Sequence, residues 1–146
     1  MAFKPLSGKS GFEKVRLTAD ASVTFHAGYL GYRDVSSGEI KEATTTTGDA
    51  TNIECIIAKT ETTAASSPTV EAYFLTPGML VVADCTNTTA ADQLNKAHLL
   101  TDGGTVNNTN THSTDINAVF VALGIVGATS EKKLWGYIAK LGQVTA

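Results

Sequence analysis

Threonine is the residue that most constrains what this chain can fold into. Residues 44–47 are all threonine. The branched Cβ restricts χ1 and suits the pleated surface of a sheet, and the hydroxyl forms hydrogen bonds in loops. With abundant alanine and glycine around them, these residues predict a β-rich protein with few side chains that perform chemistry. Further threonines stand at Thr60, Thr62, Thr63, Thr86, Thr88, Thr89, Thr105, Thr109 and Thr111.

Length and charge narrow the classes of partner. The chain has 146 residues, enough for one domain with a sizeable core. Charged residues make up only 17% of it, against a usual value of about a quarter. The net charge of −3 and the pI of about 5.5 argue against nucleic acid as a partner, since that role needs a basic face. We expect a neutral, hydroxyl-rich surface, either simply soluble or suited to close contact with copies of itself or another protein.

The first residues predict a flexible N-terminal arm, residues 1–12, in front of a single β-rich domain, residues 13–146. Pro5, Gly8 and Gly11 lie among serines and lysines, so the arm buries too little apolar surface to order itself. Its apolar residues would dock where a neighbour supplies a groove. The alternative is a frayed tail. These apolar residues are Phe3, Leu6 and Phe12.

No segment predicts a membrane partner. Residues 1–14 lack the continuous apolar stretch of a secretory signal. The longest apolar run, residues 118–128, is too short to span a bilayer and contains Gly124 and Gly127. We expect neither a secretory signal nor a membrane-spanning segment.

Short segments of β-branched and aromatic residues, separated by turn signals, predict a small β-barrel or β-sandwich. Asp34 to Gly38 is a turn cluster that indicates a hairpin. The predicted strands are residues 14–18, 22–25, 39–43, 52–60, 69–75, 79–85 and 116–126.

Three segments are harder to assign. Residues 89–100 predict one short helix, because Thr89 is a suitable N-cap and Ala90, Leu94 and Ala97 share a helical face. Residues 101–115 predict a long polar loop. Residues 131–141 fit either a helix or a strand, and their aromatic and β-branched residues favour the strand.

Candidate chemistry is sparse. The histidines, His26, His98 and His112, are far apart in sequence and show no metal-ligand spacing. Cys55 and Cys85 each lie in an apolar, strand-like segment, so buried free thiols are favoured over a disulfide. We expect no catalytic residues, no metal, no cofactor and no enzymatic activity.

Three features together resemble one family. They are the N-terminal arm, the small β domain rich in threonine, alanine and glycine, and the stretch Pro77-Gly78-Met79-Leu80-Val81-Val82-Ala83-Asp84 before a late Leu134-Trp135-Gly136-Tyr137-Ile138 strand. In these features the chain resembles the head decoration, or capsid cement, proteins of tailed bacteriophages.

The resemblance implies a structural protein of the virion. It would be made in the host cytoplasm and would bind the outer capsid surface as a homotrimer, with its arm docked on the major capsid protein. Phe3, Leu6 and Phe12 would be the apolar anchors, and Lys4, Lys9 and Lys14 would meet an acidic shell surface. Because the arm contains proline and glycine, docking with a short strand is expected rather than a long regular one.

Other functions stay open. A phage tail-tube, neck or head-completion protein shares much of this composition. A carbohydrate-binding β module would use exposed aromatic residues, for which Tyr29, Tyr32, Trp135 and Tyr137 are the candidates.

Overall fold

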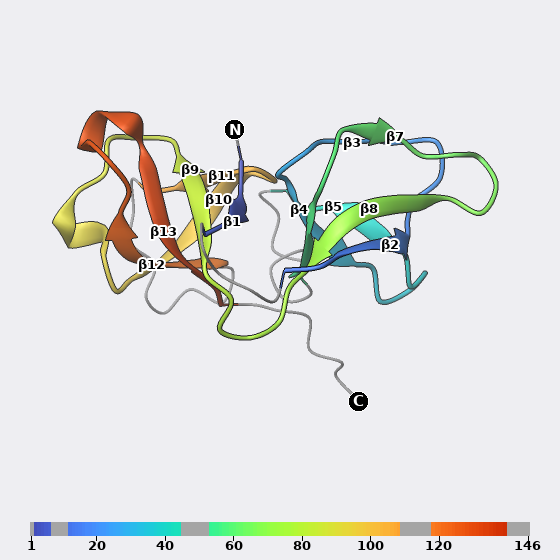
Figure 1. Ribbon diagram of the computed structural model, residues 1–146, viewed down its shortest axis with the longest axis horizontal. Helices are drawn as coiled ribbons and strands as arrows, with labels where there is room; N and C mark the ends of the chain where they lie inside the picture. Colours follow the sequence, from blue (N-terminus) through green and yellow to red (C-terminus); the bar gives the residue numbers. More distant parts are fainter. Residues whose placement is uncertain (1, 7–11, 45–52, 109–117, 140–146) are drawn as a thin grey trace.

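Five strands of the second half of the chain close on themselves into a barrel, which lies to the left in Figure 1. The computed structural model describes residues 2–6, 12–44, 53–108 and 118–139. Around the barrel the strand order is β9-β11-β10-β12-β13, and β13 pairs again with β9. The strands are β9 (Val81–Cys85), β10 (Ala97–Asp102), β11 (Thr105–Asn107), β12 (Phe120–Ile125) and β13 (Lys133–Ile138).

A second group of strands lies beside the barrel, to the right in Figure 1. Its main sheet is antiparallel, with the order β2-β8-β6-β4-β5. A parallel bridge between Ala19 and Ile40 brings the two edges of this sheet together. The strands of the sheet are β2 (Lys14–Thr18), β4 (Leu30–Arg33), β5 (Ile40–Glu42), β6 (Ile53–Ile57) and β8 (Thr69–Phe74). A small ladder of β3 (Thr24–Phe25) and β7 (Glu61–Thr62) adds to the group.

One cluster of buried side chains joins the two groups. It contains Leu30 and Ile56 of the second group together with Val81, Phe120 and Leu134 of the barrel. A smaller cluster, which includes Phe25 and Ile57, lies within the second group alone. The prediction of a mainly β protein with a small barrel is confirmed, and the two groups are packed together through a shared core.

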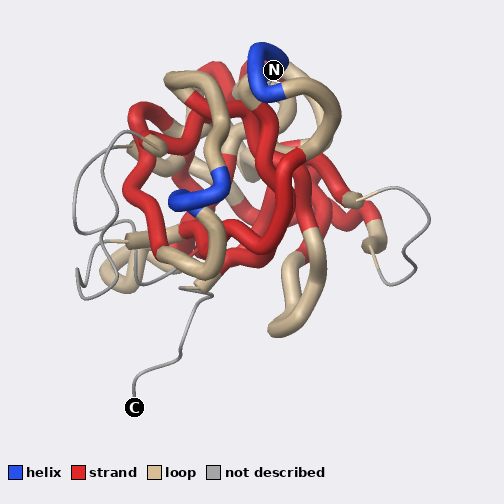
Figure 2. The backbone as a smooth tube through the Cα atoms, turned by 90° about the vertical axis from the view of Figure 1, so that its left-hand side faces the viewer, coloured by secondary structure: helices blue, strands red, loops and turns tan. Residues whose placement is uncertain are grey.

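The helix predicted over residues 89–100 is wrong. Only η2 (Ala91–Gln93), a single 3-10 turn, is helical there, and β10 begins at Ala97. Figure 2, in which the barrel group faces the viewer, shows how short the helical turns are. His98 and Leu100 are buried on alternate positions, as in a strand with one face on the core, and β10 lies between β11 and β12. The pairing of a strand inside the barrel therefore overrides the local helical spacing.

The long loop predicted over residues 101–115 is also wrong for its described part. Thr101 and Asp102 end β10, and β11 pairs with β10 as a tight hairpin. Residues 109–115 lie outside the described residues. The side chain of Asn108 is buried and bonded to Asn87, from whose N–H it accepts a hydrogen bond of 2.9 Å. A buried amide with its own partners thus fixes the end of β11.

The strand reading of residues 131–141 is confirmed for β13, in which Leu134, Gly136 and Ile138 are buried on alternate positions. A 3-10 turn, η3 (Thr129–Glu131), precedes it. Residues 140 and 141 lie outside the described residues. Alternation with a period of two is the pattern of a strand with one face on the core.

The interpretation of the cysteines as buried free thiols is confirmed, since Cys55 and Cys85 are both buried and unpaired. They belong to different core clusters, Cys85 to the shared one and Cys55 to the smaller one. Burial raises the pKa of each thiol to about 12. Because the thiolate is the reactive form, neither thiol is ionised at neutral pH.

We therefore expect the folded protein to leave both thiols unmodified by a disulfide reagent such as 5,5′-dithiobis(2-nitrobenzoate) at pH 7.5. In denaturant both should react within the mixing time, because unfolding restores an ordinary thiol pKa. Absorbance at 412 nm counts the modified thiols. Rapid modification of either thiol without denaturant would contradict the buried placement.

Candidate functional site

The N-terminal segment, residues 2–6, lies between the two groups of strands. Its strand β1 (Lys4–Pro5) pairs antiparallel with β9, with Lys4 opposite Val82 and Pro5 opposite Val81. The N–H of Leu6 donates to the carbonyl of Leu80 at 3.0 Å and continues this register. We call the place that receives the segment the arm slot, and Figure 1 shows β1 between the barrel and the second group.

The second wall of the arm slot belongs to the other group of strands. The N–H of Phe3 donates to the carbonyl of Gly28 at 2.8 Å, on the chain segment that leads into β4. Since backbone N–H groups alternate in direction along an extended chain, Phe3 faces Gly28 while Leu6 faces β9. The segment therefore connects the barrel to the second group through its own main chain.

Pro5 sits where a strand tolerates proline. Hydrogen-bonded and non-hydrogen-bonded pairs alternate in an antiparallel ladder. Because Leu6 bonds Leu80, the next pair, Pro5 with Val81, is a non-hydrogen-bonded one. The nitrogen of Pro5 points away from β9, and the ladder loses no bond. The short strand expected of this segment does form, but it forms on the protein's own barrel.

Phe3 is the side chain that fills the arm slot. It is only 1% exposed and belongs to the shared core cluster. Its ring meets that of Phe120 edge to face, with ring centroids 6.0 Å apart and an interplanar angle of 65°. Aromatic pairs favour this geometry because a positive ring edge meets a negative ring face.

Glycine lets the segment approach the second group closely. Gly28 has φ of +82°, and a Cβ there would lie 2.3 Å from the Cβ of Ala2. A Cβ on Gly104, in the turn between β10 and β11, would lie 3.2 Å from the same atom. Any larger residue at position 28 would be strained by its backbone and would also displace Ala2. The slot is therefore shaped for a small residue followed by phenylalanine.

These positions correct the expectation of an arm that is free over residues 2–6. Phe3 is part of the protein's own core and has no exposed face for a capsid contact. Phe12 is half-buried and packs against the same shared cluster, and Leu6 is also half-buried. Lys4 is exposed, Lys14 is exposed but lies 3.7 Å from Glu71, and Lys9 lies outside the described residues. Apolar surface supplied by the protein itself orders the segment, which composition alone did not reveal.

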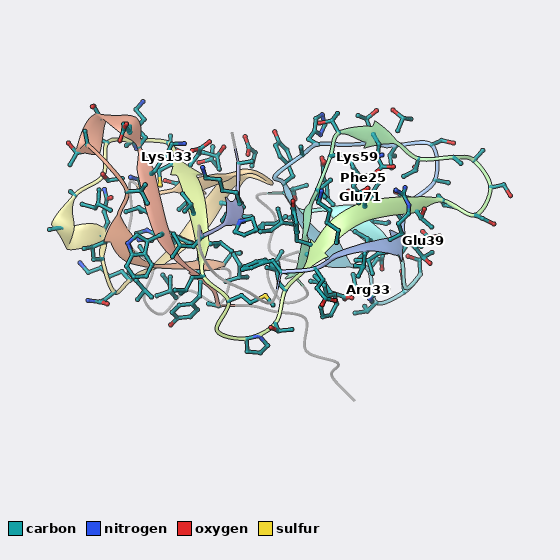
Figure 3. The ribbon with its side chains drawn as sticks, in the orientation of Figure 1. Phe25, Arg33, Glu39, Lys59, Glu71 and Lys133 are labelled. Carbon is teal, nitrogen blue, oxygen red and sulfur yellow. The ribbon has the colours of Figure 1, made fainter. Side chains whose placement is uncertain are left out.

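A second feature is the hairpin formed by β4 and β5, which confirms the hairpin predicted from the turn cluster Asp34 to Gly38. The guanidinium of Arg33 donates to both carboxylate oxygens of Glu54, at 2.7 and 2.5 Å, and to the carbonyl of Gly38 at 2.6 Å. Figure 3 labels Arg33 and Glu39, which stand on either side of the turn. A bidentate pair with a planar guanidinium fixes geometry as well as charge. The base of this hairpin is therefore held rigidly.

Residues of the hairpin itself also hold its turn in place. The carboxylate of Asp34 accepts hydrogen bonds from the N–H and hydroxyl of Ser36 at 2.8 and 2.7 Å. It also pairs with the ammonium of Lys41 at 2.9 Å. The bonds from Ser36 and then from Lys41 hold the pKa of Asp34 well below its usual range, so the turn keeps its charge in weakly acidic solution.

This fixed turn presents Val35, which is 79% exposed, more than any other large hydrophobic side chain in the described ranges. The sequence signal for it is one apolar residue inside an otherwise polar turn cluster. An apolar side chain held out by a rigid turn is ready for contact with another protein, because ordering it on binding costs little entropy.

Paired charges cover the outer face of β2 and β8. Arg16 contacts Glu61 at 2.8 Å and donates to the hydroxyl of Thr69 at 2.9 Å. Lys14 lies 3.7 Å from Glu71, which Figure 3 labels on the second group. Each of these charged groups has a partner of opposite sign within the same face, so the face is close to neutral.

The histidines do not converge within the part of the chain that the structure describes. His26 is exposed and lies 3.0 Å from Glu42, whereas His98 is buried, with its Nε2 2.8 Å from the carbonyl of Gln93. His112 lies outside the described residues. Among residues 2–6, 12–44, 53–108 and 118–139, no group of three or more histidine, cysteine or acidic side chains is placed to hold a metal ion.

The aromatic residues proposed for a carbohydrate site are half-buried and dispersed. Trp135 and Tyr137 stand on β13, whereas Tyr29 lies 5.0 Å from His26, ring to ring. Tyr32 lines a shallow hollow of about 300 Å³ on the second group. The other side chains of this hollow are Asp20, Val23, Thr24, Phe25, Lys41 and Glu42.

Comparisons with known proteins assign the chain to no family. No family model matches it, and no curated protein matches it either. In the described residues, no helix has the length and apolar character needed to cross a membrane.

Replacing Phe3 with alanine tests the arm slot. We expect Phe3→Ala to lower the free energy of unfolding by about 3–5 kcal/mol, because it leaves a cavity between the two groups of strands. Chemical denaturation followed by tryptophan fluorescence measures the change. Lys4→Ala, next in the chain but exposed, is the matched control and should change stability by no more than about 0.5 kcal/mol. Equal, small effects of both substitutions would contradict the burial of Phe3.

Proposed function

We propose that this protein is a structural component of a virion that binds the outer surface of a tailed-phage capsid and stabilises the shell. Its partners are the major capsid protein and, in a homotrimer, two further copies of itself. The resemblance to capsid decoration proteins supplies the partner, and the structure supplies surfaces that suit it.

The observation that carries the proposal is the rigid β4–β5 hairpin with Val35 at its tip. Arg33 donates from the start of the turn to the carbonyl of Gly38 at its end, and Asp34 accepts a hydrogen bond from Ser36 within it. A protein that must dock on a regular shell gains from contacts that are already in their bound conformation. We propose that Val35 inserts into an apolar hollow of the shell, where it loses its contact with water.

The paired charges and hydroxyls of the second group suit the same role. Charges that already have partners cost less to cover than isolated ones, since they keep those partners on binding. Thr24 and Thr62 likewise share a hydrogen bond of 2.9 Å between their hydroxyls. Such a face can approach another protein closely without leaving an unpaired charge behind. Lys4, exposed beside the barrel, is free to meet an acidic shell surface.

Shell stabilisation then follows from linkage and avidity. A trimer that engages several shell subunits binds more tightly than one contact, by a factor of about 10²–10⁴. A ligand that binds the expanded lattice and not the ruptured one shifts the equilibrium toward the intact shell.

One observation favours a second candidate, a carbohydrate-binding module. The hollow of about 300 Å³ combines Tyr32 with the carboxylates of Asp20 and Glu42. An aromatic face with hydrogen-bonding carboxylates is a common setting for a sugar. Binding to a glycan array, with no binding to capsids, would favour this candidate over the shell.

The test is binding to expanded capsids stripped of decoration protein, followed by sedimentation. We expect the wild-type protein to sediment with the capsids and Val35→Asp to bind at least about tenfold more weakly, because a charge would have to be buried. Ala65→Asp adds the same charge at an exposed position of the β7–β8 loop and should bind like wild type. A wild-type chain that stays in the supernatant would refute the proposed function.

Loss of binding in both variants would instead show a general effect of charge and would remove Val35 from the proposal. Circular dichroism of each variant establishes that it is folded before binding is compared.

A further inference from the structure

The arm slot has to be filled. Without residues 2–6, β9 would expose the N–H and carbonyl groups of Val82 and the carbonyl of Leu80 to water, and the shared core would lose the ring of Phe3. A segment that leaves the slot therefore has to be replaced by one that makes the same contacts.

No contact of the segment requires that it belong to the same chain. The ladder with Val81 and Val82, the bond to Gly28 and the ring contact with Phe120 all join residues 2–6 to distant parts of the sequence. The same segment from a second copy would make every one of them unchanged. Exchange of a terminal strand is a low-cost route to an oligomer for this reason.

The slot also selects the sequence of its occupant. Gly28 and Gly104 leave room for no more than the methyl group of Ala2, and the core accepts the ring of Phe3. The non-hydrogen-bonded position opposite Val81 accepts Pro5. The slot thus favours a small residue, then phenylalanine, then any residue, then proline. Positions 2–5 of this chain have this order. The slot therefore accepts the N-terminal sequence of this protein, from a second copy as well as from the same chain.

The connection between the N-terminal segment and Phe12 sets how far away a neighbouring slot can lie. Residues 7–11, between the segment and Phe12, are Ser-Gly-Lys-Ser-Gly, without a β-branched or aromatic residue. From Leu6 to Phe12 an extended chain reaches at most roughly 20 Å. The exchange therefore requires a neighbouring slot that opens within that distance of Phe12, which implies copies packed side by side around a symmetry axis.

We propose that in the assembled protein residues 2–6 of each copy fill the arm slot of the next copy, in a closed ring that leaves no slot empty. The inference takes the homo-oligomer from the proposed function, but it needs no capsid. Each copy would then be held to its neighbours by a β-strand, a core phenylalanine and the short connection between them.

A disulfide across the register of β1 and β9 tests the exchange. Lys4 and Val82 are opposite each other, so cysteines at these positions are placed to bond. The native thiols are buried and do not interfere. The double variant Lys4→Cys/Val82→Cys is purified reduced, shown to melt like wild type, oxidised, and separated on a denaturing gel without reductant.

We expect covalent oligomers that end at the size of the ring, and reductant should return them to single chains. Lys4→Cys and Val82→Cys, refolded together as single variants, should give a cross-linked pair of chains. Lys4→Cys refolded with Ala65→Cys is the matched control and should give at least tenfold less, because the β7–β8 loop lies far from β1 (Figure 1). Leu6→Cys with Leu80→Cys repeats the test at the next hydrogen-bonded pair of the register should the first pair not fold.

A double variant that cross-links only within its own chain would overturn the proposal, as would single variants that never cross-link. Capsid binding is measured separately with the wild-type protein. Normal capsid binding together with cross-links inside each chain would refute the exchange and support the proposed function. Covalent rings that do not bind capsids would support the exchange and refute the proposed function.

Discussion

Burial of Phe3 between two groups of strands is the interaction on which the rest of the structure depends. Its ring completes a core to which both groups contribute, and its N–H is bonded to Gly28 while Leu6 is bonded to Leu80. The strands of each group pair mainly with one another. The position of one group relative to the other therefore depends on this shared core. The first residues of the chain therefore fix how its two halves meet.

Closed strand pairing in both groups explains why the surface offers few free strand edges. A barrel and a sheet whose edges are bridged leave little unpaired main chain to attract other strands. Charges on the second group pair with one another, and the β4–β5 turn is fixed by Arg33 and Asp34. Exposed apolar side chains such as Val35 are therefore the points at which we propose that a partner binds.

Much of the fold could be predicted from the sequence, and the exceptions have one cause. The strand propensity of Trp135, Tyr137 and Ile138 favoured the strand that β13 forms, and the apolar setting of Cys55 and Cys85 indicated their burial. The helix predicted at residues 89–100 failed because pairing of β10 with two neighbours outweighs local spacing. Phe3 was assigned to a free arm because its own neighbours in sequence cannot bury it, whereas residues far along the chain do. Long-range contacts of this kind leave no local pattern.

Amide hydrogen exchange at Phe3 and Leu6 tests the central claim most directly. Their N–H groups donate to Gly28 and Leu80 in the arm slot. If the segment is an integral strand, both amides exchange as slowly as those of β13 and are released only by global unfolding. Exchange at the rate of an unstructured peptide, with β13 still protected, would contradict the account and return residues 2–6 to a free arm.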